Sequence, residues 1–355
     1  MKAARAQSAP TCLFDAGTRT LVVTVDGLAA TLSVSTAGAI KLNNVKCEGA
    51  TTTTTDLVQI NGSAFADKVT LVNPNAFAPG ATAEGTGLSE IEIWLSLGDG
   101  DTVTLSYTNE AEQIYFNDGL GLDVFVDGDR DVTFSGGIEI LKVKGNGGDD
   151  IIDGGQFVNT NKVYFYGGDD NDRIDGAPIG TNRLYGEDGD DELHGRGSVV
   201  YHYGGPGNDV CYGGATVDIF VADATYDGDD EYDGGDGRDT MDYSKRTNGV
   251  SVTPDDGLPN DGEPGVESDY VDADVENLTG GAGADTLVGT SAKNKLIGNA
   301  GADSLYGGPE KDSFYGGPGG DTIFNDDGVT ETVDCGPGTD DAQPDNDNFT
   351  ACELI

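Results

Sequence analysis

Apolar and polar positions recur on a strict nine-residue period in the last third of this chain. From Gly280 the sequence reads GGAGADTLV, GTSAKNKLI, GNAGADSLY, GGPEKDSFY and GGPGGDTIF without an insertion. The eighth position is always apolar, and with its two neighbours it predicts a three-residue strand whose middle side chain points inward. Self-similarity at a fixed short period predicts a stacked solenoid. The apolar anchors are Leu287, Leu296, Leu305, Phe314 and Ile323.

A polar residue holds the sixth position of every unit, two residues before the apolar anchor. A glycine opens each unit, which suits a tight turn because glycine adopts left-handed conformations without a steric penalty. The pattern therefore predicts a column of turn side chains beside a column of buried anchors. The sixth-position residues are Asp285, Asn294, Asp303, Asp312 and Asp321.

Less regular units precede this block between residues 144 and 242. GGDDNDRID, GEDGDDELH and GGPGNDVCY keep the pattern, whereas GAPIGTNRLY is one residue longer and places Asn182 in the polar role. GRGSVVYHY carries Val200 there instead. The sixth-position acids of these units are Asp150, Asp172, Asp191, Asp209, Asp218 and Asp239, and Asp340 ends a last unit, CGPGTD.

Residues 243–279 interrupt the period and are strongly acidic. Their carboxylates, which include Asp261, Glu267, Asp269 and Asp274, could hold an extra ion or could equally belong to a solvated loop.

The first 143 residues alternate on a period of two. Segments such as TRTLVVTVDG, DLVQI, DKVTLV, EIEIWLSL and DTVTLSY are short, rich in β-branched residues and bounded by Gly, Asn or Asp. They predict strands. We expect a parallel β-helix-like stack continuous with the repeats, with GDGD at residues 98–101 as a degenerate turn and a few irregular ion sites.

The nine-residue units resemble the calcium-binding nonapeptides of RTX (haemolysin-type) proteins, which are secreted bacterial proteins. The resemblance implies an all-β fold, a parallel β-roll or β-helix solenoid that is elongated and has little or no helix. It also implies several Ca²⁺ ions, each held between turns eighteen residues apart. One turn supplies the carbonyls of its second and fourth positions and its sixth-position Asp, and the next supplies its first, third and sixth positions.

The same resemblance assigns ligands to numbered residues. One site takes Gly281, Gly283, Asp285, Gly298, Ala300 and Asp303, and a second takes Asn299, Gly301, Asp303, Gly316, Pro318 and Asp321. Further sites are implied between Asp172 and Asp191 and between Asp191 and Asp209. The other ligands expected are Asp150, Gly168, Asp170, Asp172, Gly186, Glu187, Asp188, Gly189, Asp191, Gly204, Pro206, Asp209, Asp218, Asp239, Asn294, Asp312 and Asp340.

The chemistry of these turns also favours calcium without reference to the family. Calcium is a hard cation that takes six to eight oxygen ligands in flexible geometry, and backbone carbonyls and carboxylates are what the turns offer. The chain has 19 Lys and Arg against 64 Asp and Glu, a formal net charge of -45. This charge excludes nucleic acid as a partner and favours cations. Only 36% of residues are apolar, which suits a solenoid better than a globular core.

Five cysteines indicate an oxidising compartment. Cys12 and Cys47 flank the first section and Cys335 and Cys352 the last, so we expect two disulfides that close the two ends. Cys211 occupies an anchor position and is expected to be a small buried hydrophobe. No apolar run approaches the length of a membrane span. His194 and His202 lie in neighbouring units, but two histidines without a third ligand are a weak zinc signal.

The expected sections are a terminal extension (1–12), an irregular β-solenoid with a cap (13–143), a β-roll (144–242), an acidic insertion (243–279), a second β-roll (280–326) and a disulfide-closed cap (327–355). No catalytic constellation stands out, because the repeat accounts for the paired carboxylates. The sequence thus predicts an extracellular, non-catalytic calcium-binding protein with a structural, adhesive or surface-associated role and folding coupled to Ca²⁺. Self-assembly through solenoid edges and binding to a cell surface or polysaccharide are further expectations. The alternative is a polysaccharide-active β-helix enzyme, a lyase or epimerase, that carries an RTX roll.

Overall fold

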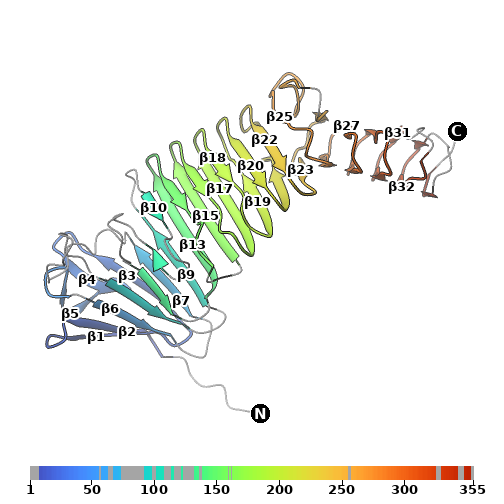
Figure 1. Ribbon diagram of the computed structural model, residues 1–355. Coiled ribbons are helices and arrows are strands. Elements are labelled where there is room, and N and C mark those ends of the chain that lie inside the picture. Colours follow the sequence, from blue (N-terminus) through green and yellow to red (C-terminus); the bar gives the residue numbers. More distant parts are fainter. Residues whose placement is uncertain are drawn as a thin grey trace, which may run out of the picture. The chain divides into compact units, whose positions relative to one another are not determined.

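The fold is described from a computed structural model (Figure 1). It describes residues 8–55, 57–62, 67–72, 92–97, 101–107, 113–115, 121–122, 132–135, 138–158, 160, 162–254, 257–324, 329–342 and 348–352. The chain divides into two compact units, residues 1–182 and 183–355, and the division falls within β17 (Thr181–Asp188). Within these ranges every regular element is a strand, and no helix could span a membrane. The all-β prediction is confirmed.

The described residues of the first unit contribute strands to three sheets. One has the order β1 (Thr11–Asp15), β2 (Thr20–Thr24), β6 (Leu57–Asn61), β8 (Glu92–Ser96), β12 (Val132–Ser135) and β11 (Gly121–Leu122). A second runs β5 (Val45–Thr51), β4 (Ala39–Leu42), β3 (Ala29–Val34), β7 (Lys68–Val72), β9 (Asp101–Ser106), β13 (Ile138–Gly147) and β15 (Lys162–Asp169). The third has β10 (Gln113–Tyr115), β14 (Ile151–Asp153) and β16 (Arg173–Asp175).

In the longer strands of this unit, two inward side chains per strand build the core. In the second sheet, Ala30, Val69, Val103, Leu141 and Val163 occupy matching positions on successive parallel strands and are buried. A parallel column two residues further along repeats the arrangement with Leu32, Leu71, Leu105, Val143 and Phe165. The alternation read from the sequence therefore predicted the inward faces.

The edge of this unit differs from the parallel stack that the sequence predicts. β1–β2, β3–β4, β4–β5 and β11–β12 are antiparallel pairs. Between β4 and β5, Asn43 and Asn44 have φ angles of 49° and 65°. Two consecutive residues with positive φ make the type of two-residue hairpin turn that matches strand twist. This turn reverses the chain at Leu42, and the Cys12–Cys47 disulfide ties β1 to β5.

The second unit is built from short parallel strands, which Figure 1 shows as successive coils. One sheet has β18 (Glu192–His194), β20 (Val210–Gly214), β22 (Glu231–Gly235) and β25 (Tyr270–Val271). Another has β19 (Val199–Tyr203), β21 (Val217–Val221), β23 (Thr240–Asp242), β26 (Asn277–Thr279), β28 (Lys295–Ile297), β30 (Ser313–Tyr315), β32 (Thr332–Asp334) and β34 (Asn348–Thr350). The third has β24 (Ser251–Val252), β27 (Thr286–Val288), β29 (Ser304–Tyr306), β31 (Thr322–Phe324) and β33 (Asp341–Ala342).

A single anchor from each short strand fills the interior of the second unit. Leu287, Leu305 and Ile323 lie in register on β27, β29 and β31 and are fully buried. Each is flanked by two partly exposed residues, as the nine-residue pattern predicts. Cys211 is a free, buried anchor of β20. The Cys335–Cys352 disulfide forms at the end of the repeats, as expected.

The segment expected to be an insertion contributes strands to the roll. β25 pairs in parallel with β22, and β26 joins β23 to β28. Residues 257–260 and 264–266 are among the exposed residues of this segment. The coil closes on residues far apart in sequence, so the nine-residue period is lost there although the stacking continues.

Candidate metal centres

A ladder of aspartates links successive coils of the second unit. The backbone N–H of Asp285 donates to Oδ1 of Asp303 at 2.8 Å, that of Asp303 to Asp321 at 3.0 Å, and that of Asp321 to Asp340 at 3.0 Å. The residues follow one another at the length of one coil, 18 or 19 residues. Each carboxylate is therefore held at a fixed orientation by the coil before it.

Two further ladders run along the other sheets of this unit. In one, Asp191, Asp209, Asp230 and Asp269 are joined N–H to Oδ1 at 2.9, 2.9 and 3.1 Å. In the other, the N–H of Asp218 donates to Asp239 at 2.8 Å, and that of Asp239 to Oε2 of Glu276 at 2.9 Å. The described part of this unit thus holds three columns of acidic side chains, all buried except Glu276.

The second carboxylate oxygen of many ladder residues has no hydrogen-bond donor. Oδ2 of Asp209, Asp239, Asp303, Asp321 and Asp340 is buried and finds no partner among the residues that the structure describes. Leaving a buried charged oxygen without a partner is costly, so such groups normally pair with a cation or bind a proton. These oxygens are therefore the positions at which a cation would be stabilised.

Carbonyl oxygens of both coils lie close to the facing turn beside Asp303 and Asp321. Those of Asn299 and Gly301 point at the later coil, because a Cβ added to Gly317 or Gly319 would meet them at 1.7 and 1.4 Å. The Gly316 carbonyl points back, 2.7 Å from a Cβ added to Gly298, and the Pro318 carbonyl accepts from the Gly301 N–H at 3.1 Å. The structure thus brings together the six residues predicted for this site. The atoms that these residues could offer to a metal ion are all oxygens, which are the ligands that Ca²⁺ prefers.

The same arrangement occurs between Asp191 and Asp209. A Cβ added to Gly205 or Gly207 would lie 2.1 Å from the Glu187 carbonyl or 1.7 Å from the Gly189 carbonyl. In the later coil, the Gly204 carbonyl lies 2.5 Å from a Cβ of Gly186, and the Pro206 carbonyl accepts from Gly189 N–H at 3.0 Å. Asp188 belongs to the same turn and is exposed. Two pairs of coils therefore show the same arrangement of carbonyl and carboxylate oxygens.

The site predicted between Asp285 and Asp303 differs in one respect. The Gly283 carbonyl lies 1.9 Å from a Cβ of Gly301, as in the other sites, and that of Gly281 accepts from Ala300 N–H at 3.3 Å. Both oxygens of Asp285 already accept hydrogen bonds, from Val250 and Gly281. This pair of coils thus presents one fewer unpartnered carboxylate oxygen.

Asn294 occupies a ladder position, but both groups of its side-chain amide already have hydrogen-bond partners. Its Oδ1 accepts from the Thr290 N–H at 3.1 Å, and its Nδ2 donates to the Glu276 carbonyl at 2.7 Å. Asn182 behaves in the same way toward Ala177. An amide can both donate and accept, so it closes a turn that a carboxylate leaves with an unpartnered oxygen.

In the first unit, the predicted ligands form one comparable step. The N–H of Asp150 donates to Oδ1 of Asp172 at 2.8 Å, and the Gly148 N–H donates to Asp170 at 3.3 Å. A Cβ added to Gly168 would lie 2.4 Å from the Asn146 carbonyl. Asp172 and Asp191 belong to different units, so the site expected between them stays a prediction. In the second unit, the predicted ligand Asp312 accepts a hydrogen bond from the Asn294 N–H at 2.7 Å.

The nine-residue pattern does not identify several of the ladder residues. Asp230, Asp269 and Glu276 are followed two residues later by the buried anchors Tyr232, Val271 and Leu278. The same acid-x-apolar signal marks Asp67 and Asp101 in the first unit, where the N–H of Asp67 donates to Asp101 at 2.7 Å. That local signal could have located all five residues, although they are separated by irregular lengths of chain.

Burial raises the pKa values of the ladder carboxyls. Desolvation raises the pKa of Asp209 to about 9, that of Asp269 to about 8, and those of Asp230 and Asp239 to about 7. It also raises the pKa values of Asp285, Asp303 and Asp321 to about 6. The hydrogen bond from the preceding coil acts in the opposite direction on each of these groups.

The raised pKa values predict an inverted pH dependence in calcium-free buffer. An aspartate in the unfolded chain has a pKa of about 3.9, below the raised pKa values of the folded chain. From about pH 4 upward the folded chain therefore binds more protons than the unfolded chain. Folding stability should therefore fall as the pH rises from about 5 to about 8. With saturating Ca²⁺ the order should reverse, because the ion requires ionised ligands. Thermal unfolding after resin treatment, at both pH values, tests this, and equal transitions in the two metal-free samples would contradict it.

One position in the acidic segment already has a cation supplied by the chain. Arg246 is buried, with 2% of its surface exposed, and its guanidinium pairs with Asp227 and, at 2.9 Å, with Oε2 of Glu267. Asp227 lies three residues before the ladder residue Asp230, and Glu267 lies two residues before the ladder residue Asp269. A guanidinium can satisfy two carboxylates at once and stays charged when buried. Arg246 therefore provides, between these coils, the positive charge that an ion would otherwise supply.

Clusters of side chains alone do not mark these centres. In the described ranges, no group of three or more His, Cys, Asp or Glu side chains is arranged to hold a metal ion. His202 is buried beside Asp218, with Nε2 and Oδ1 3.4 Å apart, and His194 contacts Glu192. The candidate centres instead offer carbonyl oxygens together with one carboxylate from each coil.

Comparison with known proteins agrees with this geometry. The family model described as the RTX calcium-binding nonapeptide repeat (4 copies) matches residues 142–160, 163–178, 179–198, 203–220, 225–241, 270–292, 279–310 and 288–323. No curated protein matches the chain. The matched segments contain the turns that carry these carboxylates and carbonyls. The chain is therefore an RTX-type repeat protein whose calcium-binding nonapeptides lie between residues 142 and 323.

Proposed function

We propose that this protein is an extracellular, non-catalytic calcium-binding roll with a structural, adhesive or surface-associated role. The observation that carries the proposal is the set of buried, unpartnered carboxylate oxygens that face the carbonyls of a neighbouring coil. Such a set is unfavourable by itself and favourable around a divalent cation. Folding of the roll is accordingly coupled to Ca²⁺.

The best-supported ligands belong to two pairs of coils. One pair contributes Asn299, Gly301, Asp303, Gly316, Pro318 and Asp321, and the other contributes Glu187, Gly189, Asp191, Gly204, Pro206 and Asp209. Calcium tolerates irregular geometry and a high share of carbonyl ligands, whereas Mg²⁺ requires near-octahedral geometry at shorter distances.

Two features support an extracellular location. The disulfides Cys12–Cys47 and Cys335–Cys352 are typical of oxidising compartments. Calcium sites of extracellular modules have Kd values of about 10⁻⁴ to 10⁻³ M, so they fill outside the cell and stay empty in the cytosol. The roll would therefore fold after export.

Asp303 and Asn294 give opposite tests of the ligand assignment. Asp303 faces two coils, so Asp303→Asn is expected to reduce the number of bound Ca²⁺ ions by one or two. Asn294→Asp replaces a self-satisfied amide with a carboxylate and is expected to add an ion or tighten one. Equilibrium dialysis with radioactive calcium measures both changes, with thermal unfolding at ~10 mM Ca²⁺ as a second readout.

Glu310→Gln is the matched control, because it removes one exposed carboxylate from the same roll without altering a ladder. The assignment is wrong if Asp303→Asn binds as many ions as the parent, or if Glu310→Gln loses as many. Release of products from an acidic polysaccharide by the purified parent chain would overturn the non-catalytic part of the proposal.

A further inference from the structure

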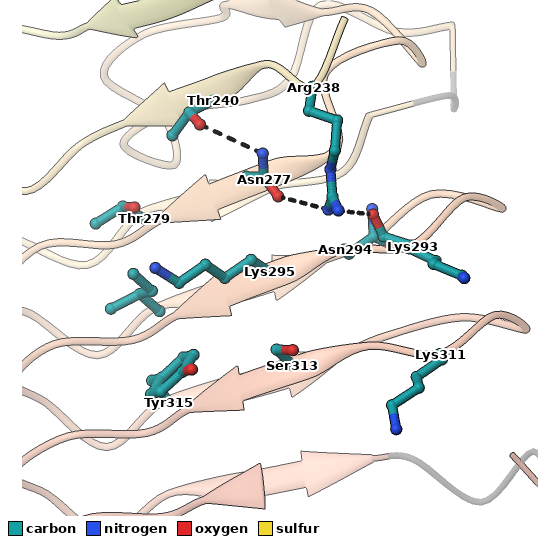
Figure 2. A pocket seen from close by; sticks show the side chains of 11 residues that line it. Arg238, Thr240, Asn277, Thr279, Lys293, Asn294, Lys295, Lys311, Ser313 and Tyr315 are labelled. Atoms are coloured by element: carbon teal, nitrogen blue, oxygen red, sulfur yellow. Dashed lines mark hydrogen bonds between the residues drawn. The ribbon is translucent and has the colours of Figure 1, made fainter. Parts of the chain in front are cut away.

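A cleft of about 380 Å³ lies on the outer face of β23, β26, β28 and β30 (Figure 2). Its lining includes four cations, Arg238, Lys293, Lys295 and Lys311, and no Asp or Glu. The whole chain has 19 Lys and Arg against 64 Asp and Glu. A purely basic lining is therefore contrary to the general charge of the protein.

The repeat explains how these cations come to lie together. Arg238, Lys293 and Lys311 each come directly before a ladder position, in the exposed turn that leads into β23, β28 or β30. β28 pairs with β30 in parallel, so Lys293 and Lys311 stand one strand apart, about 4.8 Å along the stack. The cations form a row that runs across the strands.

Two of the cations are held in place by the protein. Nη2 of Arg238 donates to Oδ1 of Asn277 at 3.2 Å and to the Lys293 carbonyl at 2.9 Å, as Figure 2 shows. Nζ of Lys295 lies 5.3 Å from the centre of the Tyr315 ring. No salt bridge within the described residues engages Lys293, Lys295 or Lys311. Their charges are therefore available to a ligand, and their mutual repulsion favours an anionic one.

The remaining lining is suited to sugars. Thr240, Thr279 and Ser313 present hydroxyl groups along the same strands, whereas the Asn277 amide is engaged by Arg238 and Thr240. Tyr315 is 38% exposed, so part of its ring can pack against an apolar sugar face. Neutral hydrogen-bonding groups between regularly spaced cations suit a polymer that alternates hydroxyls with carboxylates.

The geometry points to this cleft as a binding site for an acidic polysaccharide chain. The carboxylates of successive sugars pair with Arg238, Lys293 and Lys311, the hydroxyls bond to Thr279 and Ser313, and one ring packs on Tyr315. The polymer lies along the stack, so that one coil faces one sugar. A polyphosphate such as nucleic acid is a poorer occupant, because the charge of -45 repels its denser charge. This site deepens the adhesive role proposed above and rests on it.

The test uses the full chain at a fixed free Ca²⁺ concentration and short oligogalacturonates as the probe, measured by calorimetry. Lys293→Gln/Lys295→Gln/Lys311→Gln is expected to weaken binding by at least about tenfold, and Tyr315→Ala by a smaller factor. Binding should also weaken as salt rises from about 50 to 300 mM. The matched control Lys41→Gln/Lys46→Gln/Lys68→Gln removes three lysines of the first unit and should bind like the parent.

Three results would overturn the site. These are parent-like affinity of the triple variant, an equal loss in the control, and failure of the parent to bind oligogalacturonate while it binds single-stranded DNA or anionic vesicles. Calcium stoichiometry, measured on the same samples, separates this inference from the proposed function. Normal calcium binding without polysaccharide binding would reject only the cleft.

Discussion

Removal of calcium from the full chain is expected to unfold the coils between residues 183 and 342. The reason is the stack of buried carboxylates, in which Asp303, Asp321 and Asp340 each keep an unpartnered oxygen. At ~10 mM Ca²⁺, a site with a Kd of about 10⁻⁴ to 10⁻³ M contributes about 1.4–2.7 kcal/mol to the free energy of unfolding. Several such sites together reach the size of a whole domain's stability, about 5–15 kcal/mol.

Circular dichroism during EGTA treatment and re-addition of Ca²⁺ measures this effect. The strand signal should fall and then recover, and limited proteolysis should cut the second unit before the first. The first unit should persist longer, because its longer strands bury two apolar side chains each, such as Val69 and Leu71. Mg²⁺ is the control cation and should not restore the signal at equal concentration. An unchanged signal and an unchanged unfolding temperature in EGTA would refute the coupling.

Replacement of Arg246 by methionine is expected to be the most damaging single substitution in the second unit. It leaves the buried carboxylates of Asp227 and Glu267 without their cation, and breaking a buried ion pair from one side costs about 3–5 kcal/mol. Burial already raises the pKa values of both acids although Arg246 lowers them, so the pair depends on this charge. For a unit of this size, the loss corresponds to a fall of about 6–20 °C in Tm.

Arg238→Met is the matched control, because Arg238 is exposed and its loss should change Tm by no more than a few degrees. Glu267→Gln in the Arg246→Met background should recover part of the lost stability, since it removes one of the two stranded charges. Equal melting of Arg246→Met and the parent at saturating Ca²⁺ would show that Arg246 does not serve as an internal cation.

Much of the roll could be predicted from local spacing. The nine-residue period predicted a stacked solenoid, and the resemblance to RTX repeats implied two units per coil, which the register of Leu287, Leu305 and Ile323 confirms. Asp303 and Asp321 share the same spacing, so their contact was predictable, whereas the carbonyls beside them were implied by the resemblance to RTX repeats. The disulfide partners followed from the position of each cysteine pair at one end of the chain.

Contacts between residues far apart in the sequence could not be predicted from that spacing. Asp230 donates its N–H to Asp269, 39 residues later, so no short period could pair them. The two-residue turn at Asn43 and Asn44 produced antiparallel strands in a section where parallel ones were expected. Asn294 differs from the other ladder residues only through bonds to Thr290 and Glu276, which depend on the folded turn.

The sequence by itself determined the coil, because a glycine turn, an acid and an apolar anchor at fixed spacing leave the chain one way to bury the anchor and stack the turns. The tertiary structure decided how the charges are compensated. It placed Arg246 between two buried acids, left the ladder oxygens facing carbonyls of the next coil, and gathered Arg238, Lys293 and Lys311 on one outer face. These outcomes depend on which coils become neighbours, and electrostatic energy follows distance in space rather than separation along the chain.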